Sequence, residues 1–285
     1  MKLLAVFAHP DDESMGLGGT LAKYAAEGVE TYLVCATRGE RGWWDSEGPN
    51  PGLEGVGKIR TKELENAGKI LGLKEIHFLN YIDGDLDQAD PKEAIGKIVT
   101  QLRRIKPDVV VTFAHDGAYG HPDHIAISQF ATAALVCAAD GNYHDAENLP
   151  PHRVSKLYYF VDTEAIASLY EKYLGPIEFP VDDQVRGESP WKDWMITTHV
   201  DVSAYSKTAW EACLCHKSQL PSLALLMKLP VEEVQKLLAM QGTFYRAMSS
   251  VNGGRKVETD LFEGLTMSLR GSPSLKRRAA DEAIS

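Results

Sequence analysis

The sequence of 285 residues lacks the features that mark several large classes of protein. No apolar run approaches the roughly 20 residues needed to cross a bilayer, and charged residues follow the short N-terminal apolar run at once. We therefore expect neither a membrane protein nor a signal peptide. A net charge of −10 leaves no excess of basic side chains for a nucleic-acid-binding face.

Cysteine is also scarce, and the four cysteines have no spacing typical of a metal site or a disulfide framework. Cys35 falls in a predicted strand and the others in predicted helices, so we expect buried free thiols. This usage fits a reducing compartment and predicts a cytoplasmic protein. The sequence contains no G-x-S-x-G motif and no cysteine with a plausible base beside it, which argues against serine or thiol hydrolysis.

What the sequence does contain is a regular alternation of strand and helix patterns over its first 160 residues. Strands followed by helices in this order imply a parallel sheet with right-handed crossovers and helices on both faces, a Rossmann-like α/β fold. The predicted strands cover residues 3–7, 29–36, 75–79, 108–113 and 156–161, and the predicted helices cover 14–27, 58–71, 91–105 and 125–139.

The pattern becomes less regular after residue 160, but no linker or internal repeat is visible. We expect one domain over residues 1–270, with the core sheet in 1–160 and a C-terminal α+β elaboration in 161–270. The final stretch, 271–285, is predicted to be a flexible tail. The sequence leaves open whether the chain forms a homo-oligomer. Within the elaboration we expect helices over 163–173, 203–216 and 230–241, a loop over 176–190, extended chain over 195–202 and a strand over 243–248.

Two of the predicted strands end in the same kind of polar cluster. His-Pro-Asp-Asp-Glu at 9–13 follows the first strand, and Tyr-Gly-His-Pro-Asp-His at 119–124 follows the fourth. The carboxyl ends of parallel strands meet at one sheet edge, where open α/β folds place their ligands. Buried charge at such a place is costly unless it is paired or ligated, so the two clusters predict the two halves of a metal site.

Two competing motifs are rejected on chemical grounds. The glycines at 16, 18 and 19 suggest a phosphate-binding turn, but the carboxylates just before them would repel phosphate. The acidic run 83–93 suggests a calcium loop, but Gln88 and Ala94 stand where such a loop needs Gly and Glu.

On its motifs, the sequence resembles the LmbE-like, or GlcNAc-phosphatidylinositol de-N-acetylase (PIG-L), family of zinc-dependent deacetylases. The resemblance covers residues 1–140 well, and H-x-S-Q at 216–219 is a weaker echo. The stretch GAYGHPDH is most similar to the branch that acts on amino-sugar thiols and their conjugates, as in mycothiol biosynthesis and S-conjugate cleavage. The motifs are AHPDDE at 8–13, TRGERG at 37–42, R-x-x-E-L at 60–64, L-G at 71–72, D-G at 83–84 and HPDH at 121–124.

The resemblance implies that His9, Asp12 and His124 bind the metal and that Asp11 is the general base. Two imidazoles and one carboxylate suit a catalytic zinc with an open position, where the pKa of a bound water can fall to about 7. Zn²⁺ is the expected cofactor, with Fe²⁺ as an alternative in the cell, because affinity follows metal availability as well as ligand type.

The resemblance also implies that His121 and Tyr119 stabilise the oxyanion, with Asp123 keeping His121 oriented. Simpler interpretations stay open at this point. Asp11 and Asp123 could each cap the helix that follows, and Tyr119 could be an ordinary loop aromatic. Glu13 fits equally well as a helix cap or as a residue supporting the ligands.

Substrate contacts are expected from residues that match sugar-binding positions of the family. An Arg fork at Arg60 and a carboxylate at Asp83 suit hydroxyl groups because they form directional, charge-assisted hydrogen bonds. The neighbouring tryptophans at 43 and 44 could form a platform for a sugar face, or simply pack their loop. The remaining candidate contacts are Arg38, Trp43 and His216.

The leading hypothesis is a metal-dependent hydrolase that removes an acetyl group from an N-acetylglucosaminyl compound, so the expected partner is a small amino-sugar conjugate. An alternative within the class is an amidase that cleaves a bulkier amide such as a mycothiol S-conjugate. From another class, non-haem Fe(II) oxygenases also use two His and a carboxylate, although usually on strand-rich scaffolds. A non-catalytic sugar-binding relative is disfavoured, because binding alone requires neither Asp11 nor His121.

Overall fold

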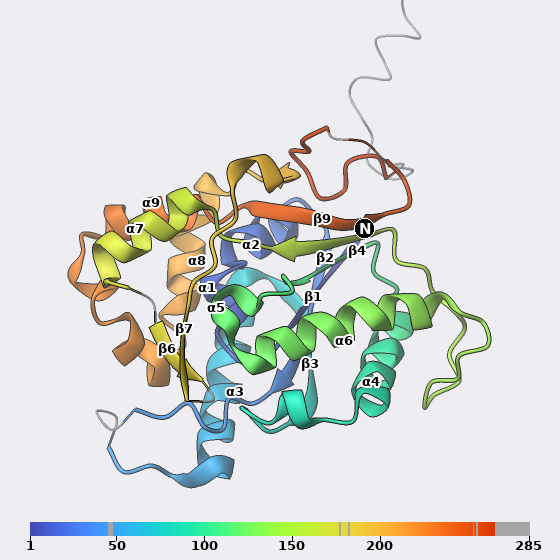
Figure 1. Ribbon diagram of the computed structural model, residues 1–285, viewed down its shortest axis with the longest axis horizontal. Coiled ribbons are helices and arrows are strands. Elements are labelled where there is room, and N and C mark those ends of the chain that lie inside the picture. Colours follow the sequence, from blue (N-terminus) through green and yellow to red (C-terminus); the bar gives the residue numbers. More distant parts are fainter. Residues whose placement is uncertain (45–47, 177, 182, 253, 255, 266–285) are drawn as a thin grey trace, which may run out of the picture.

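The computed structural model in Figure 1 describes residues 1–265 except 45–47, 177, 182, 253 and 255. The tail predicted over 271–285 lies outside the described residues. A seven-stranded sheet forms the centre of the molecule and confirms the α/β fold. Its strand order is β3 (Leu73–Tyr81), β2 (Glu30–Thr37), β1 (Lys2–Phe7), β4 (Val109–Phe113), β5 (Lys156–Phe160), β9 (Thr243–Ser249) and β8 (Thr198–His199).

The first five strands form the predicted parallel part of the sheet. β1 pairs with β2 and with β4, and the pairs β2–β3 and β4–β5 extend the sheet on either side. The side chains from Leu3 to Phe7 have no exposed surface. A strand covered on both faces must be apolar throughout, which is why this run could be recognised in the sequence.

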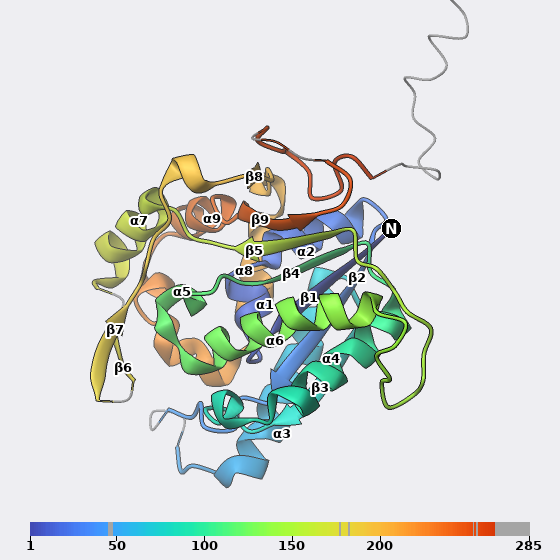
Figure 2. The same cartoon turned by 45° about the vertical axis from the view of Figure 1, so that its right-hand side comes forward.

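Helices cover both faces of the sheet, as Figures 1 and 2 show. Two of them, α4 and α6, pack together on one face, while α2, α3 and α8 pack together on the other. Among the described residues, no helix is long and apolar enough to cross a bilayer. The helices are α1 (Asp12–Met15), α2 (Gly18–Ala26), α3 (Gly52–Leu71), α4 (Pro91–Ile105), α5 (Gly117–Gly120), α6 (Pro122–Ala139), α7 (Glu164–Leu174), α8 (Ser206–Cys213) and α9 (Val231–Ala239).

Two helix predictions need correction. The helix expected over 14–27 is divided into α1 and α2, and a side chain at Gly16 would collide with the ring of Phe160. The helix expected from residue 58 begins at Gly52, although Gly52, Gly55 and Gly57 have low helix propensity. Packing outweighs that preference, because Val56 is fully buried.

The C-terminal part adds antiparallel structure to the sheet. β9 pairs antiparallel with both β5 and β8. The loop predicted over 176–190 is wrong, because an antiparallel hairpin of β6 (Glu178–Val181) and β7 (Gln184–Gly187) lies there. Its strands are short, and Pro180 and the flanking Gly and Pro residues are typical of a loop, so the pattern carried no strand signal.

A buried polar network joins the chain after β9 to the sheet. The Lys156 ammonium lies 2.8 Å from a Glu258 carboxylate oxygen, and both residues have no exposed surface. Tyr158 on β5 and Thr198 on β8 donate hydrogen bonds to the same carboxylate. The Glu258 carboxylate on the C-terminal segment is therefore bound by side chains from two strands, β5 and β8.

Candidate active site

The two polar clusters meet at the carboxyl ends of β1 and β4, which are neighbours in the sheet. This is where the strand order reverses, since the chain runs from β1 through β2 to β3 and then returns to β4 on the other side. Such a switch point is the usual ligand site of an open α/β sheet. The two clusters therefore lie together at the sheet edge where the sequence predicts them.

His9, Asp12 and His124 lie together with donor atoms at metal-ligand spacing. His9 Nδ1 is 3.2 Å from His124 Nε2, and the Asp12 carboxylate oxygens are 3.5 Å from His124 Nε2 and 3.9 Å from His9 Nδ1. Bonds of about 2.1 Å in a tetrahedral arrangement would separate donor atoms by about 3.4 Å. The donor set therefore fits a divalent cation such as Zn²⁺.

The remaining ring nitrogens of both histidines are held by other groups. His9 Nε2 lies 3.0 Å from Asp123 and 3.0 Å from Asp83, and His124 Nδ1 lies 3.2 Å from the Gly117 carbonyl. Contacts of this kind fix the ring orientation and decide which nitrogen faces a metal. His9 Nδ1 and His124 Nε2 are thereby left pointing at each other and at Asp12.

These contacts bear on two predicted roles. The carboxylate of Asp123 holds His9, not His121, and it also accepts the N–H groups of Gly84 and Leu86. Asp83 is 8% exposed and its carboxylate lies on His9, and its contact with sugar hydroxyls stays a prediction. Both carboxylates hold His9, which lies more than 70 positions earlier in the sequence, so this role depends on the fold.

The protonation of the cluster reflects its burial. Burial alone would lower the pKa of His9, but hydrogen bonds to Asp123 and Asp83 raise that pKa well above its usual value. Burial raises the pKa of Asp12 to about 7, and burial together with His9 lowers the pKa of His124. A divalent cation among these groups would favour the neutral imidazole and the ionised carboxylate that ligation requires.

Asp11 lies beside this cluster and is held by a buried arginine. Arg60 Nη2 is 3.2 Å from the Asp11 carboxylate, and the same guanidinium donates to the carbonyls of Pro10 and Gly39. Burial raises the pKa of Asp11, opposed by the charge of Arg60. The Asp11 side chain makes no capping hydrogen bond to α1, so the cap interpretation is not supported.

Arg60 itself is only 3% exposed, and its hydrogen bonds are directed at Asp11 and the backbone. In the structure the guanidinium contacts Asp11, and a contact between Arg60 and the sugar stays a prediction.

His121 caps the first turn of α6, and its Nδ1 accepts the N–H of Asp123 at 3.1 Å. The neutral ring must then carry its proton on Nε2, which makes that atom a donor. Burial, with His9 close by, lowers the pKa of His121 to about 4. Since His121 is the cap, the interpretation of Asp123 as the cap is wrong. The Tyr119 ring lies 5.9 Å from the His121 ring and 5.2 Å from that of His124.

The other predicted substrate residues divide into two groups. His216 is 1% exposed and its Nε2 lies 2.8 Å from Glu13, so the prediction that it contacts substrate is wrong. Arg38 donates to Thr61 and Asn80, and Trp43 donates to the Gly48 carbonyl. These contacts anchor Arg38 and Trp43 locally, and their substrate role stays a prediction.

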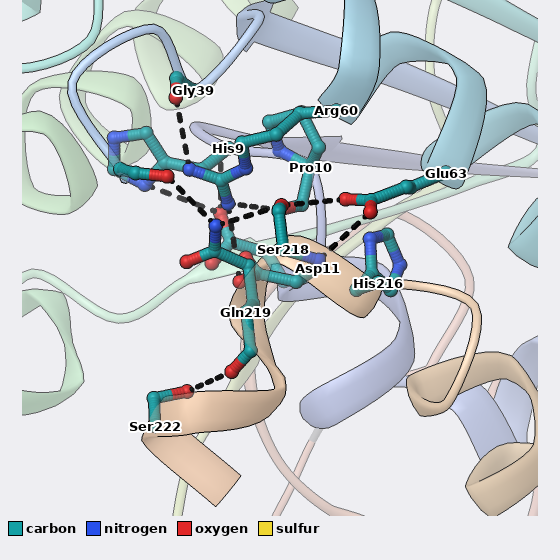
Figure 3. A network of polar contacts seen from close by, with 12 residues as sticks. His9, Pro10, Asp11, Gly39, Arg60, Glu63, His216, Ser218, Gln219 and Ser222 are labelled. Atoms are coloured by element: carbon teal, nitrogen blue, oxygen red, sulfur yellow. Dashed lines mark hydrogen bonds and ion pairs between the residues drawn. The ribbon is translucent and has the colours of Figure 1, made fainter. Parts of the chain in front are cut away.

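The polar network in Figure 3 includes residues that were not predicted from the sequence. Ser218 donates from its N–H and its hydroxyl to Glu63 on α3, at 2.8 and 2.7 Å. Gln219 donates to the Gly42 carbonyl at 2.8 Å. The signal was present as H-x-S-Q at 216–219, but its partners lie more than 150 residues earlier.

Comparisons with known proteins place the chain in a family. The PIG-L profile, described as GlcNAc-PI de-N-acetylase, matches residues 4–135. A mycothiol S-conjugate amidase of Streptomyces coelicolor is 31% identical, over 93% of this chain and 97% of its own. A 1D-myo-inositol 2-acetamido-2-deoxy-alpha-D-glucopyranoside deacetylase of Streptomyces griseus is 34% identical, over 95% and 91%.

Solved structures agree with this placement. The conserved protein TT1542 of Thermus thermophilus matches 88% of this chain and 96% of its own with a TM-score of 0.61 and 28% identity. The N,N'-diacetylchitobiose deacetylase of Pyrococcus horikoshii shares the fold, with a TM-score of 0.64 and 24% identity over 86% and 83% of the two chains. The chain therefore belongs to the PIG-L family of GlcNAc-PI de-N-acetylases.

Proposed function

We propose that this protein is a metal-dependent hydrolase that removes an acetyl group from an N-acetylglucosaminyl compound. The observation that carries the proposal is the Asp11 carboxylate, held by Arg60 beside the His9, Asp12 and His124 donor set. A ligand set with an adjacent, independently held carboxylate suits hydrolysis of an amide. The relatives named as deacetylases and as an amidase support the same reaction type.

His9, Asp12 and His124 would hold the metal, which we propose to be Zn²⁺, with Fe²⁺ as the alternative in the cell. When bound, the cation supplies Lewis-acid chemistry that polarises an amide carbonyl and acidifies a water molecule. The donor set, two imidazoles and one carboxylate, leaves room for a fourth position.

The protein groups around this set then have separate tasks. Arg60 engages one oxygen of Asp11, so the other oxygen accepts the proton of the attacking water and later passes it to the leaving amine. His121 directs its Nε2–H toward the oxygen that becomes negative when water adds to the carbonyl. Tyr119, whose ring faces both His121 and His124, is proposed to assist at the same oxygen.

A second candidate substrate is a bulkier amide such as a mycothiol S-conjugate, because a relative with that activity covers nearly the whole chain. The acetamido sugar is the first choice because several relatives at about the same identity are named as deacetylases of it. Arg38 and Trp43 are proposed to contact the part of the substrate beyond the sugar. None of the relatives named above is an oxygenase.

The test is amine release by the purified zinc-loaded protein from two substrates, 1D-myo-inositol 2-acetamido-2-deoxy-α-D-glucopyranoside and a mycothiol S-conjugate. We expect kcat/KM to be higher for the acetamido sugar, and the reverse order would establish the amidase alternative. Asp11→Asn should lower kcat by about 10²–10⁴-fold with unchanged metal content. A loss smaller than tenfold would show that Asp11 is not the base.

We also propose that the protein acts in the cytoplasm. All four cysteines are free in the structure, and Cys35 and Cys213 are buried. Unpaired thiols are typical of a reducing compartment. Fractionation of cells that express the tagged full chain would check this location.

A further inference from the structure

We infer that Glu13 and His216 form a buried positioning pair that holds the backbone of Asp11 in the conformation its function requires. The inference builds on the proposed function, in which Asp11 is the general base. Their side chains bond to each other, to Ser14 and to the Asp11 N–H, and neither has exposed surface above 1%. Their role is therefore to act through Asp11 and not on a substrate.

Asp11 needs such support because its backbone is strained. Its φ is +116° and its ψ is −26°, in a region that residues with a side chain rarely adopt. Strain of this kind persists only where the surrounding structure enforces it, and it gathers at functional sites. At this position it turns the chain sharply between His9 and Asp12, so that both can face the same point while Asp11 stands beside them.

Two contacts enforce this conformation from opposite sides. The Asp11 N–H donates to Glu13 Oε2 at 3.0 Å, which fixes the peptide on the α1 side. On the α3 side, Arg60 donates to the Pro10 carbonyl at 2.5 Å and to the Asp11 carboxylate at 3.2 Å. Without the Glu13 contact, the Pro10–Asp11 peptide would lose the acceptor of its N–H group and keep only the arginine on its carbonyl oxygen.

Glu13 can serve as this acceptor because His216 satisfies its other oxygen. His216 Nε2 lies 2.8 Å from Glu13 Oε1, and the Ser14 hydroxyl donates to the same oxygen. A fully buried carboxylate is costly unless it is hydrogen-bonded or paired. Among the described residues, His216 Nδ1 has no hydrogen-bond partner, so the polar contacts of this ring are made by Nε2, at Glu13 and Ser14.

The position of His216 is in turn fixed by the residues that follow it (Figure 3). Ser218 binds Glu63 on α3, and Gln219 binds the Gly42 carbonyl. Glu63 lies one helical turn after Arg60 on α3. The contact between Ser218 and Glu63 therefore joins the segment that carries His216 to the helix that carries Arg60.

The first test separates positioning from general stability. We expect Glu13→Ala and His216→Ala to lower kcat by about 10–100-fold, with KM and metal content unchanged. His216→Gln should recover most of the loss, because its amide nitrogen replaces Nε2 as the donor to Glu13. Ser206→Ala is the matched control, since it removes the hydrogen bond from a buried serine hydroxyl to the Ser203 carbonyl at the start of α8 without touching Glu13 or the 216–219 segment, and it should change kcat by less than about threefold.

Equal losses for His216→Ala and His216→Gln would overturn the proposal, as would a loss for Ser206→Ala as large as that for His216→Ala. Reduced metal content in Glu13→Ala would assign that residue to the metal site instead. The two His216 variants carry the comparison if Glu13→Ala does not fold.

The second test does not depend on turnover. Amide hydrogen exchange by NMR should show the Asp11 N–H protected in the wild type and exchanging at least tenfold faster in His216→Ala, but not in Ser206→Ala. Unchanged exchange would refute the pairing. A wild type that hydrolyses neither amide but shows this exchange pattern would refute the proposed function and retain the positioning pair.

Discussion

At the scale of single residues, the site depends on carboxylates that orient other side chains. Asp123 has no exposed surface and holds His9 Nε2, which leaves His9 Nδ1 for a cation. Removing such a support typically costs 10–100-fold in metal affinity. We therefore expect Asp123→Asn to weaken Zn²⁺ binding by about that factor, measured by competition with a chromophoric chelator. Asp87→Asn, an exposed change on the neighbouring segment, is the control and should leave the affinity unchanged.

Arg60 offers a second test at this scale, because its fork makes three separate contacts. It donates to the carbonyls of Gly39 and Pro10 and to Asp11. A lysine ammonium cannot reproduce this planar geometry. Arg60→Lys should lower kcat by about tenfold or more while bound zinc, measured by elemental analysis, stays at wild-type level. An unaltered kcat would mean that Asp11 needs no support from α3.

His9, Asp12 and His124 could be proposed from the sequence, because the family resemblance implies them and each lies beside the end of a predicted strand or the start of the helix after it. Roles that depend on contacts across the fold could not be predicted. Asp83 and Arg60 carried a family signal, but that signal does not say whether a side chain faces the substrate or another residue. Only the packing of α3 and of the loop after β3 decides this.

At the scale of elements, short or glycine-rich segments were the ones predicted wrongly. The hairpin of β6 and β7 and the first turns of α3 are stabilised by contacts to the rest of the molecule, and local preference argues against both. The parallel strands were found because burial on both faces leaves a continuous apolar run, which is a local signal.

The junction between α9 and β9 gives a test at this scale. A Cβ added at Gly242 would overlap the backbone carbonyl of Val200, the residue that directly follows β8. Backbone cannot move aside cheaply, so Gly242→Ala should lower the free energy of unfolding by about 1–3 kcal/mol in a urea titration. Gly96→Ala is the control. Its Cβ would meet only the Tyr143 hydroxyl at 3.5 Å, and alanine should stabilise α4 by about 0.5–1 kcal/mol.

At the scale of the whole molecule, we propose a single domain over residues 1–270, in which the C-terminal part completes both the sheet and the site. One apolar core cluster includes Leu3 on β1 together with Phe244 on β9 and Phe262 beyond it. The buried Lys156–Glu258 pair joins the same parts of the chain. The topology after β5 could not be predicted, because antiparallel additions follow no crossover rule.

Glu258 should make the stability of this assembly depend on pH. Burial alone would raise the pKa of Glu258, but hydrogen bonds from Lys156, Tyr158 and Asn252 lower it to about 2. A depressed pKa means that the contribution is complete above the unfolded value of about 4.3 and is lost as the pH falls toward 2. The difference in unfolding free energy between wild type and Glu258→Gln should therefore be largest above pH 5. A difference that grew on acidification would contradict this assignment.

Metal binding should also stabilise the whole molecule, since a ligand that binds only the folded state raises its stability by about 2.7 kcal/mol at a hundred times its dissociation constant. Chelation should lower Tm, and added Zn²⁺ should restore it. Asp11→Asn should show the same Tm shift as wild type, whereas His124→Ala should show little. Equal shifts in His124→Ala and wild type would place the metal elsewhere.

The contact between residues 13 and 216 also orders events while the chain is being made. β1 leaves the ribosome first, yet it lies between β2 and β4 and cannot be flanked until residue 113 has emerged. Glu13 is paired later still, because its buried partner His216 has to be synthesised first. A nascent chain that stops between residues 124 and 216 already contains both histidine motifs. Its Asp11 can be contacted by Arg60, but Glu13 still lacks its partner His216. The protein therefore acquires its full site late in synthesis, when the 216–219 segment docks on α3.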